Sequence, residues 1–172
     1  ISMGLVQHAV GGLYDPTDQI AEDQLNAILE AAVAQDAAAI KVQFAPNAIA
    51  VQPELDDQIE ALFDYYDSEN GEIDNISGRA GSASDGAGGK NCYYEMSGKI
   101  VSGEMYLVYI RAITEDTNDP DNVGVWALLL RRKADEADYP DGLSYHVKGE
   151  EDMIGVYVGL PAYRFDLGLP TE

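Results

Sequence analysis

The first part of the chain carries apolar residues at the spacing of amphipathic helices. From residue 18 to about 35 they recur every three or four positions, with acidic residues between them, as on a helix that buries one face. Turn residues at 15–17 precede this stretch and offer an N-cap. The same spacing returns after Pro53, which suits a first helical turn, and ends near residue 67. Two helices are therefore predicted in this part.

Between these helices the hydrophobic period changes from that of a helix to that of a strand. Residues 40–44 alternate strictly between apolar and polar side chains, which is typical of a half-buried strand. Pro46-Asn47 then forms a turn, and residues 48–51 are predicted to be a second short strand.

The second half is typical of strands separated by turns. The predicted strands are 91–97, 104–114, 123–133, 143–148, 153–158 and 162–167. Two runs, 105–110 and 125–130, are apolar on both faces, as expected of strands at the centre of a sheet that is covered on both sides. Turn sequences at 119–122 and 139–142 favour antiparallel connections.

The segment 68–90 consists mostly of Gly, Ser, Ala, Asp and Asn, so it is predicted to be a long mobile loop. The chain has 172 residues, close to the usual size of one domain, and the parts on either side of this segment are each small for a core of their own. A single domain over 1–172 is therefore expected.

Together these elements predict an α+β fold. Two N-terminal helices pack on a mainly antiparallel β-sheet that is formed largely by residues 91–168. The alternative is an all-β jelly roll, in which the alanine-rich first part would be a helical insertion.

The chain is strongly acidic, and the charge is spread along it. It carries 31 acidic residues against ten basic ones, for a formal net charge of -21. No acidic tail exists, so the charge belongs to the folded surface. Asp outnumbers Glu and Lys is scarce. Such a surface is tolerable where molar salt shortens the Debye length to about 3 Å, so salt adaptation is one explanation of the acidity and a functional role is the other.

The acidity and the hydropathy pattern limit the expected partners. A negative field repels nucleic acid and anionic membranes and attracts cations or basic proteins. No apolar run approaches the roughly 18 residues of a membrane span, and residues 1–10 lack the basic start of a retained signal peptide. Cys92 is the only cysteine, which excludes an intrachain disulfide. We expect a protein partner or self-association, without direct nucleic-acid or membrane binding.

Two oxygen-rich segments are candidates for calcium, which prefers carboxylate and carbonyl ligands. The first, at 66–74, fails the spacing of a calcium loop, because Tyr66 stands where the first aspartate belongs. The second joins two strong strands, and Asp116, Asp119 and Asp121 are its candidate ligands. Acidic turns of this kind are also common without metal, so this segment is either a calcium site or an ordinary inter-strand turn.

Catalytic motifs are absent from the sequence. There is no Gly-x-Ser-x-Gly elbow and no phosphate-binding loop, and the imidazoles are limited to His8 and His146. A Cys92–His146 pair would be needed for thiol chemistry, whereas a buried structural role is the commoner one for a strand cysteine. No catalytic residue and no bound cofactor are therefore predicted.

Tyrosines are concentrated in the β half of the chain. Their large contact area and polar tip suit protein interfaces as well as ordinary strands. The candidate interface residues are Tyr106, Tyr109, Tyr145, Tyr157 and Tyr163.

These patterns favour a non-enzymatic structural or assembly protein, such as a salt-adapted virion or surface component that associates with itself or with another protein. The alternative is an acidic inhibitor or nucleic-acid mimic that occupies a basic groove on a partner. A small hydrolase is the third hypothesis, and it would require a cleft with convergent titratable groups.

Overall fold

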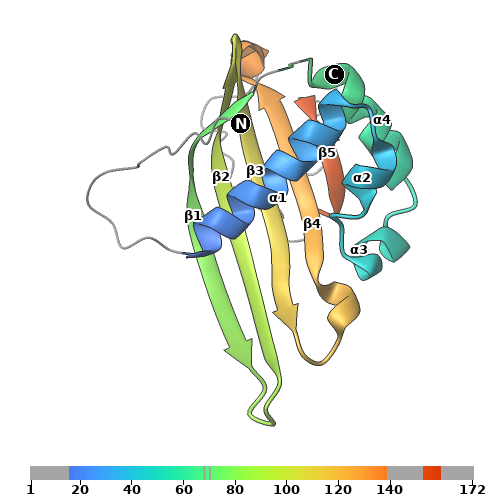
Figure 1. The fold of residues 1–172 in the computed structure, drawn as a ribbon, viewed down its shortest axis with the longest axis vertical. Coiled ribbons are helices and arrows are strands. Elements are labelled where there is room, and N and C mark those ends of the chain that lie inside the picture. Colours follow the sequence, from blue (N-terminus) through green and yellow to red (C-terminus); the bar gives the residue numbers. More distant parts are fainter. Residues whose placement is uncertain (1–15, 68, 70, 139–152, 160–172) are drawn as a thin grey trace, which may run out of the picture.

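A computed structural model describes residues 16–67, 69, 71–138 and 153–159. The helices are α1 (Pro16–Val33), α2 (Ala37–Lys41), α3 (Pro46–Val51) and α4 (Leu55–Tyr65), followed later by the 3-10 turns η1 (Pro120–Asn122) and η2 (Lys133–Asp138). The strands are β1 (Glu72–Ser84), β2 (Lys90–Ser102), β3 (Glu104–Asp116), β4 (Gly124–Arg132) and β5 (Gly155–Val158). The helices lie against one face of the sheet, with α1 crossing the strands (Figure 1).

The strands form one sheet in the order β1-β2-β3-β4-β5. The first four are consecutive antiparallel neighbours, whereas β5 pairs parallel with β4. The α+β prediction is therefore confirmed, with N-terminal helices on a mostly antiparallel sheet, and the jelly-roll alternative is wrong.

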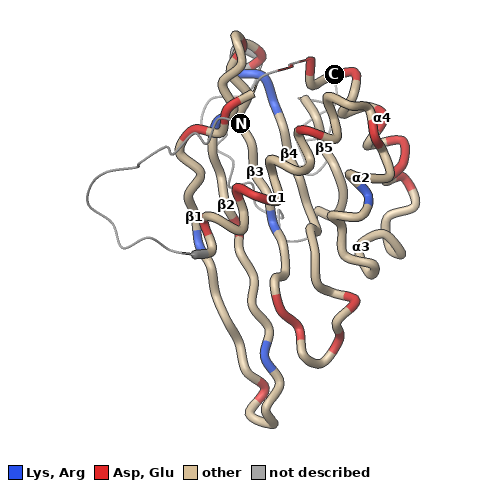
Figure 2. The backbone as a smooth tube through the Cα atoms, viewed as in Figure 1, with Lys and Arg blue, Asp and Glu red and all other residues tan. Residues whose placement is uncertain are grey.

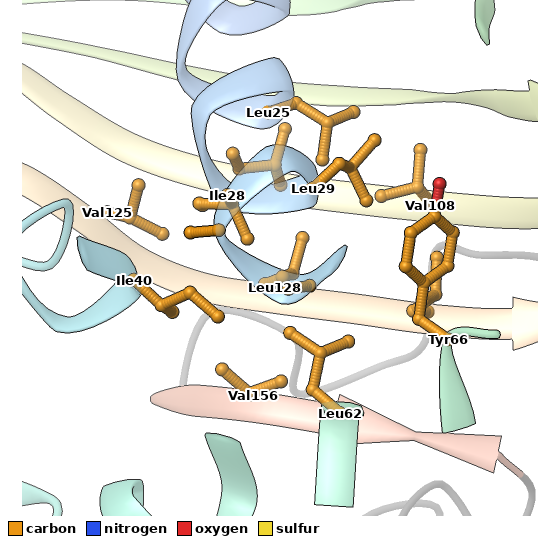
Figure 3. Packing of buried hydrophobic residues seen from close by; sticks show 14 of the residues in the cluster. Leu25, Ile28, Leu29, Ile40, Leu62, Tyr66, Val108, Val125, Leu128 and Val156 are labelled. Atoms are coloured by element: carbon orange, nitrogen blue, oxygen red, sulfur yellow. The ribbon is translucent and has the colours of Figure 1, made fainter. Parts of the chain in front are cut away.

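The hydrophobic core lies between the helices and the sheet. Leu25 and Ile28 of α1 and Leu62 of α4 are fully buried against Val108 of β3 and Leu128 of β4, as Figure 3 shows. Burying a side chain of this size contributes about 1.5–3 kcal/mol relative to leaving it exposed. The two amphipathic helices predicted from the sequence are confirmed by these contacts.

The prediction that β3 is central is confirmed by burial on both of its faces. Val108 and Ile110 belong to the core under the helices, and Leu107 and Tyr109, which alternate with them, are 7% and 1% exposed on the opposite face. β4 follows the same pattern, since Leu129 and Leu130 are both buried.

The two short strands predicted at 40–44 and 48–51 are wrong, because α2 and α3 occupy this part of the chain. The Asp36 carboxylate caps α2 by accepting a hydrogen bond from the Ala39 N–H at 3.0 Å, and Pro46 stands in the first turn of α3. Only Phe44, between the helices, forms a bridge with β4, at Val125. Periodicity over five residues could not distinguish these short helices from a strand.

The long loop predicted at 68–90 is wrong for 72–84, which is strand β1. It pairs antiparallel with β2 over most of its length, with a bulge between Asp74 and Ser77. Glycine is required where the strands approach closely: a Cβ on Gly78 would lie 2.0 Å from the Glu95 carbonyl oxygen. Small side chains gave β1 a weak propensity signal, and pairing with β2 decides its structure.

A short turn at 85–89 remains from the predicted loop. The Asp85 carboxylate accepts hydrogen bonds from the N–H groups of Ala87 and Gly89 at 2.8 and 2.9 Å. These bonds and the one from Asn118 hold the pKa of Asp85 below its usual value, with the Ala87 N–H as the largest cause.

The other predicted strands have different outcomes. Three of them correspond to β2, β3 and β4, and the segment 153–158 contains β5. The predictions at 143–148 and 162–167 lie outside the described residues. The observed sheet begins at residue 72, well before the predicted start at 91.

Candidate functional site

The oxygen-rich turn between β3 and β4 is held together by its own hydrogen bonds. One Asp116 oxygen accepts from the N–H groups of Asn118 and Asp119, both at 3.0 Å. The other accepts from the side-chain amides of Asn91 and Asn122 at 3.1 and 2.9 Å. These donors lower the pKa of Asp116, with the Asn122 amide as the largest cause.

The Asp119 carboxylate has a similar role in this turn. Its two oxygens accept from the Asp121 N–H at 3.2 Å and from the Asn47 side chain at 2.9 Å, which joins the turn to α3. In the described part of the chain, no three or more His, Cys, Asp or Glu side chains come together in a way that could hold a metal ion. The geometry accounts for Asp116 and Asp119 as turn-forming residues.

Two of the five candidate interface tyrosines are buried within the described fold. Tyr106 and Tyr109 are 0% and 1% exposed, because their strand is central and covered on both faces. Tyr157 of β5 is half-buried, and its hydroxyl donates to the Ile154 carbonyl at 3.0 Å. Tyr145 and Tyr163 lie outside the described residues. Among the described candidates, Tyr106 and Tyr109 are therefore core residues.

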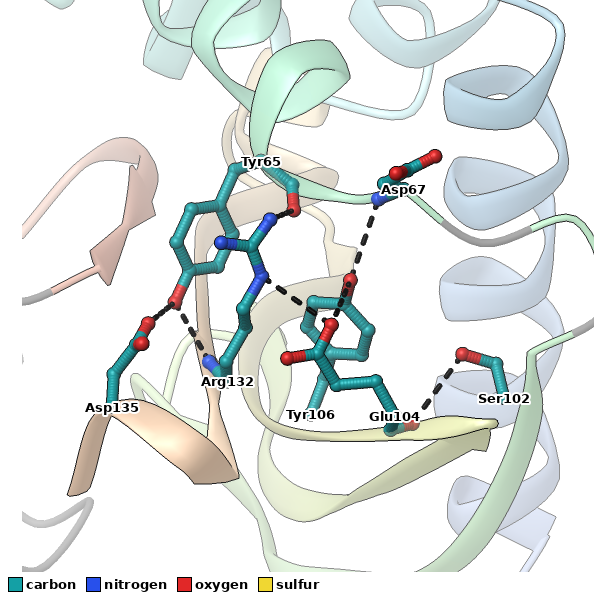
Figure 4. Close-up of polar contacts among 7 residues, drawn as sticks. All are labelled: Tyr65, Asp67, Ser102, Glu104, Tyr106, Arg132 and Asp135. Carbon is teal, nitrogen blue, oxygen red and sulfur yellow. Dashed lines mark hydrogen bonds and ion pairs between the residues drawn. The ribbon is translucent and has the colours of Figure 1, made fainter.

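Tyr65 and Arg132 form a polar network that the sequence did not reveal (Figure 4). The Arg132 guanidinium lies 4.4 Å from the centroid of the Tyr65 ring, and its Nη2 donates to the Tyr65 carbonyl at 2.7 Å. The Tyr65 hydroxyl accepts from the Arg132 N–H at 2.7 Å and donates to Asp135 at 2.8 Å. Glu104 lies 3.6 Å from the Arg132 Nε.

This network fixes the C-terminal end of α4 to the sheet. Tyr65 is the last residue of α4, so its carbonyl is one of those left without an intrahelical partner, and a cation at this end also complements the helix dipole. Tyr66 and Tyr106 extend the cluster with an edge-on ring contact at 5.1 Å. The hydrogen bonds and ring contacts of this network therefore join α4 to β3 and β4.

Charge is distributed unequally between the two layers of the fold. The five strands carry six acidic and six basic residues, for a net formal charge of zero. α1 and α4 each carry four acidic residues and no basic one. Figure 2 shows the acidic positions along these helices and in the β3–β4 connection. The sheet is therefore a neutral part of a strongly acidic molecule.

The outer side of β1 is the most evident candidate for an interface. β1 is at the end of the strand order, and among the described residues only β2 pairs with it. None of its thirteen residues is buried. Residues 77–84 of β1, the β1 edge, follow the bulge and carry no acidic residue and one basic residue, Arg79. The hairpin end of β1 and β2 extends beyond the helices (Figure 1).

Residues 27–134, from within α1 to the start of η2, match a protein family described as a domain of unknown function (DUF5104). The chain belongs to this family. The matched region includes Tyr65 and Arg132, β1 and the oxygen-rich turn. No curated protein matches the chain, and the family description gives no activity.

The described residues show the surroundings of the Cys92 thiol and the character of the helices. The Cys92 thiol lies 3.7 Å from a Glu115 oxygen, which also pairs with Lys90 at 2.8 Å. His146, its proposed catalytic partner, lies outside the described residues. None of the helices described here combines the length and the apolar character needed to cross a bilayer.

Proposed function

We propose that this chain is a non-enzymatic assembly protein that associates with a second copy of itself through the β1 edge. Two β1 strands would pair antiparallel and join two sheets into one. The observation that carries the proposal is that, in the described part of the chain, β1 has a neighbouring strand on one side alone, so its outer side presents a row of backbone N–H and C=O groups in strand geometry. Such an edge is a template for another strand.

Charge favours this edge over the other surfaces for contact between two copies. Each molecule carries a formal charge of -21, so acidic surfaces repel one another. The β1 edge has no carboxylate of its own, and its single cation, Arg79, is paired with Glu95 of β2. Two copies can approach here without placing carboxylates on paired strands.

The shape of the β1 edge also permits close pairing. Apart from Arg79, its side chains are those of Gly, Ala and Ser, which leave the backbone accessible. The usual protections of an edge strand are charged side chains, proline and bulges. The bulge of β1 precedes this segment, and no proline occurs in it.

Association should depend on salt and on concentration. Each interstrand hydrogen bond contributes about 0.5–1.5 kcal/mol net, and association itself costs on the order of 4–15 kcal/mol, so a short ladder gives a reversible dimer. Long-range repulsion opposes the dimer where the Debye length is about 10 Å, near 0.1 M salt, and is screened near 1 M.

Light scattering coupled to size-exclusion chromatography tests this proposal. At high salt the wild type should have twice the 18.6 kDa mass of one chain, and the dimer should dissociate on dilution. Ala83→Lys places a charge on the β1 edge and should give a monomer. Ala61→Lys on the exposed side of α4 changes the net charge equally and should leave the dimer intact. A wild-type monomer at every salt concentration, or equal effects of the two variants, would refute the proposal.

The alternative, an acidic inhibitor or nucleic-acid mimic, is favoured by the eight carboxylates of α1 and α4. Such a protein should bind a decalysine peptide in calorimetry at low salt, and the affinity should fall when Asp56, Asp57 and Glu60 are replaced by their amides. Equal affinity of this triple variant and the wild type would contradict the mimic, because the helix layer would then not be the binding face.

A further inference from the structure

A hollow of about 300 Å³ lies on the face of the sheet that points away from the helices. Tyr94 and Met96 of β2 face the core, so the alternating residues Tyr93 and Glu95 face the opposite side. The walls of the hollow include Asn91, Tyr93, Glu95, Arg111, Ile113 and Trp126.

Two aromatic side chains form part of these walls. Tyr93 is 37% exposed, so the hollow is reachable from solvent. A Cβ on Gly81 of β1 would lie 2.7 Å from the Tyr93 ring, which means that this glycine leaves the space that the ring occupies. The Trp126 indole N–H donates to the Asn122 carbonyl at 2.8 Å. The Trp126 ring is therefore held by a hydrogen bond before any ligand arrives, and the Tyr93 ring lies over Gly81.

Polar groups of both signs surround the aromatic walls. The Glu95 side chain is 13% exposed and pairs with Arg79, and Arg111 stands opposite Glu95 in the strand register. Arg111 donates from Nη2 to the Met153 carbonyl at 2.6 Å. The Asn91 amide nitrogen donates to Asp116, which directs the Asn91 nitrogen to the turn, and the amide oxygen of this side chain can accept from a ligand hydroxyl.

We propose that this hollow binds one neutral sugar ring of a saccharide. Aromatic faces pack against the C–H face of a pyranose, while hydroxyl groups can donate to Asn91 and Glu95 and accept from the Tyr93 hydroxyl. The volume is at the lower end of small-molecule sites, which suits a single ring.

Charge selects a neutral ligand over an ionic one. The overall charge of -21 repels anions. A cation would meet Arg111 in the wall, and the Glu95 carboxylate, the acidic group among the described lining residues, is already paired with Arg79. A hydroxylated neutral ring avoids both penalties and still uses the aromatic surfaces. The self-association proposal uses the backbone of the β1 edge, whereas this site uses side chains of β2, β3 and β4.

Trp126 provides a direct reporter, because it is the only tryptophan in the chain. Its fluorescence can be excited selectively and followed during titration with methyl glucoside, methyl galactoside and methyl N-acetylglucosaminide. We expect a saturable change with at least one of them and a Kd in the millimolar range, about -4 kcal/mol. Tyr93→Ala should weaken that binding at least about tenfold.

Matched controls make the titration decisive. Val101→Ala changes a 40% exposed side chain on the same strand and the same face, and it should leave the affinity unchanged. Glycerol, benzoate and benzyltrimethylammonium should give no saturable change. The proposal is overturned if no glycoside gives saturation at about 100 mM, roughly a hundredfold above the expected Kd, if an ionic probe saturates instead, or if both variants lose binding equally.

Discussion

Replacing Arg132 tests whether its network fixes α4 to the sheet. Arg132→Ala removes the hydrogen bond to the Tyr65 carbonyl, the guanidinium from the Tyr65 ring and the ion pair with Glu104. Each lost contact joins α4 to β4 or β4 to β3, so the variant should lower the free energy of unfolding without changing the fold.

The expected loss follows from the three contacts. The charged hydrogen bond is worth about 1.5–3 kcal/mol and the cation–ring contact about 1 kcal/mol. The Glu104 pair, with side chains 30% and 42% exposed, adds at most about 0.5 kcal/mol. Because water can replace part of the lost hydrogen bond at this partly exposed site, we expect a net loss of about 2–3 kcal/mol, or a Tm lower by about 4–12 °C.

Two further variants separate the contributions. Arg132→Lys keeps the charge and loses the planar fork and its stacking on Tyr65, so it should give about half of the loss. Tyr65→Phe keeps the ring under the guanidinium but leaves the Arg132 N–H without its acceptor, which should cost about 1–2 kcal/mol.

Urea denaturation followed by circular dichroism measures these differences through the midpoint at constant m-value. Lys99→Ala removes one positive charge from an exposed position of β2 and controls for the change in net charge. If Arg132→Ala falls within about 1 kcal/mol of Lys99→Ala, the network does not stabilise the α4 junction, and the reasoning is refuted.

Three other predictions follow from the fold. Gly78→Ala should destabilise by about 1–3 kcal/mol, since its Cβ would lie 2.0 Å from the Glu95 carbonyl oxygen; Ser82→Ala on the same strand should change the urea midpoint little, and equal midpoints would contradict the close approach. The lowered pKa values of Asp85 and Asp116 contribute stability that is complete above the unfolded pKa of about 3.9 and is lost as pH falls through the folded value. Asp116→Asn should make the fall of Tm with decreasing pH less steep below about pH 4. An unchanged fall of Tm would contradict the contribution of this carboxylate. Finally, Tm should rise as NaCl is raised toward about 1 M, where repulsion is screened, and equal Tm values would argue against salt adaptation.

The sequence by itself determined the parts of the fold whose pattern extends over many residues. The helices α1 and α4 were predictable, because apolar residues at helical spacing over ten or more positions report which face is buried. The central strands β3 and β4 were predictable from their continuous apolar runs, which are typical of strands covered on both faces. The net charge could also be determined from the sequence. The sequence also placed the largest share of the excess acid in the helical first part, and the strand assignment adds that the five strands together have no net charge.

Only the tertiary structure decided the rest. β1 is a strand because β2 supplies its hydrogen-bond partners, and its glycines fit against Glu95 and Tyr93, a contact that local composition does not encode. Tyr106 and Tyr109 are core residues because the sheet is covered on both faces. The meeting of Tyr65 with Arg132, 67 residues apart, and the hollow beside Trp126 both depend on the strand register. That register is fixed by packing across the whole sheet, and for this reason the candidate sites could not be located from the sequence.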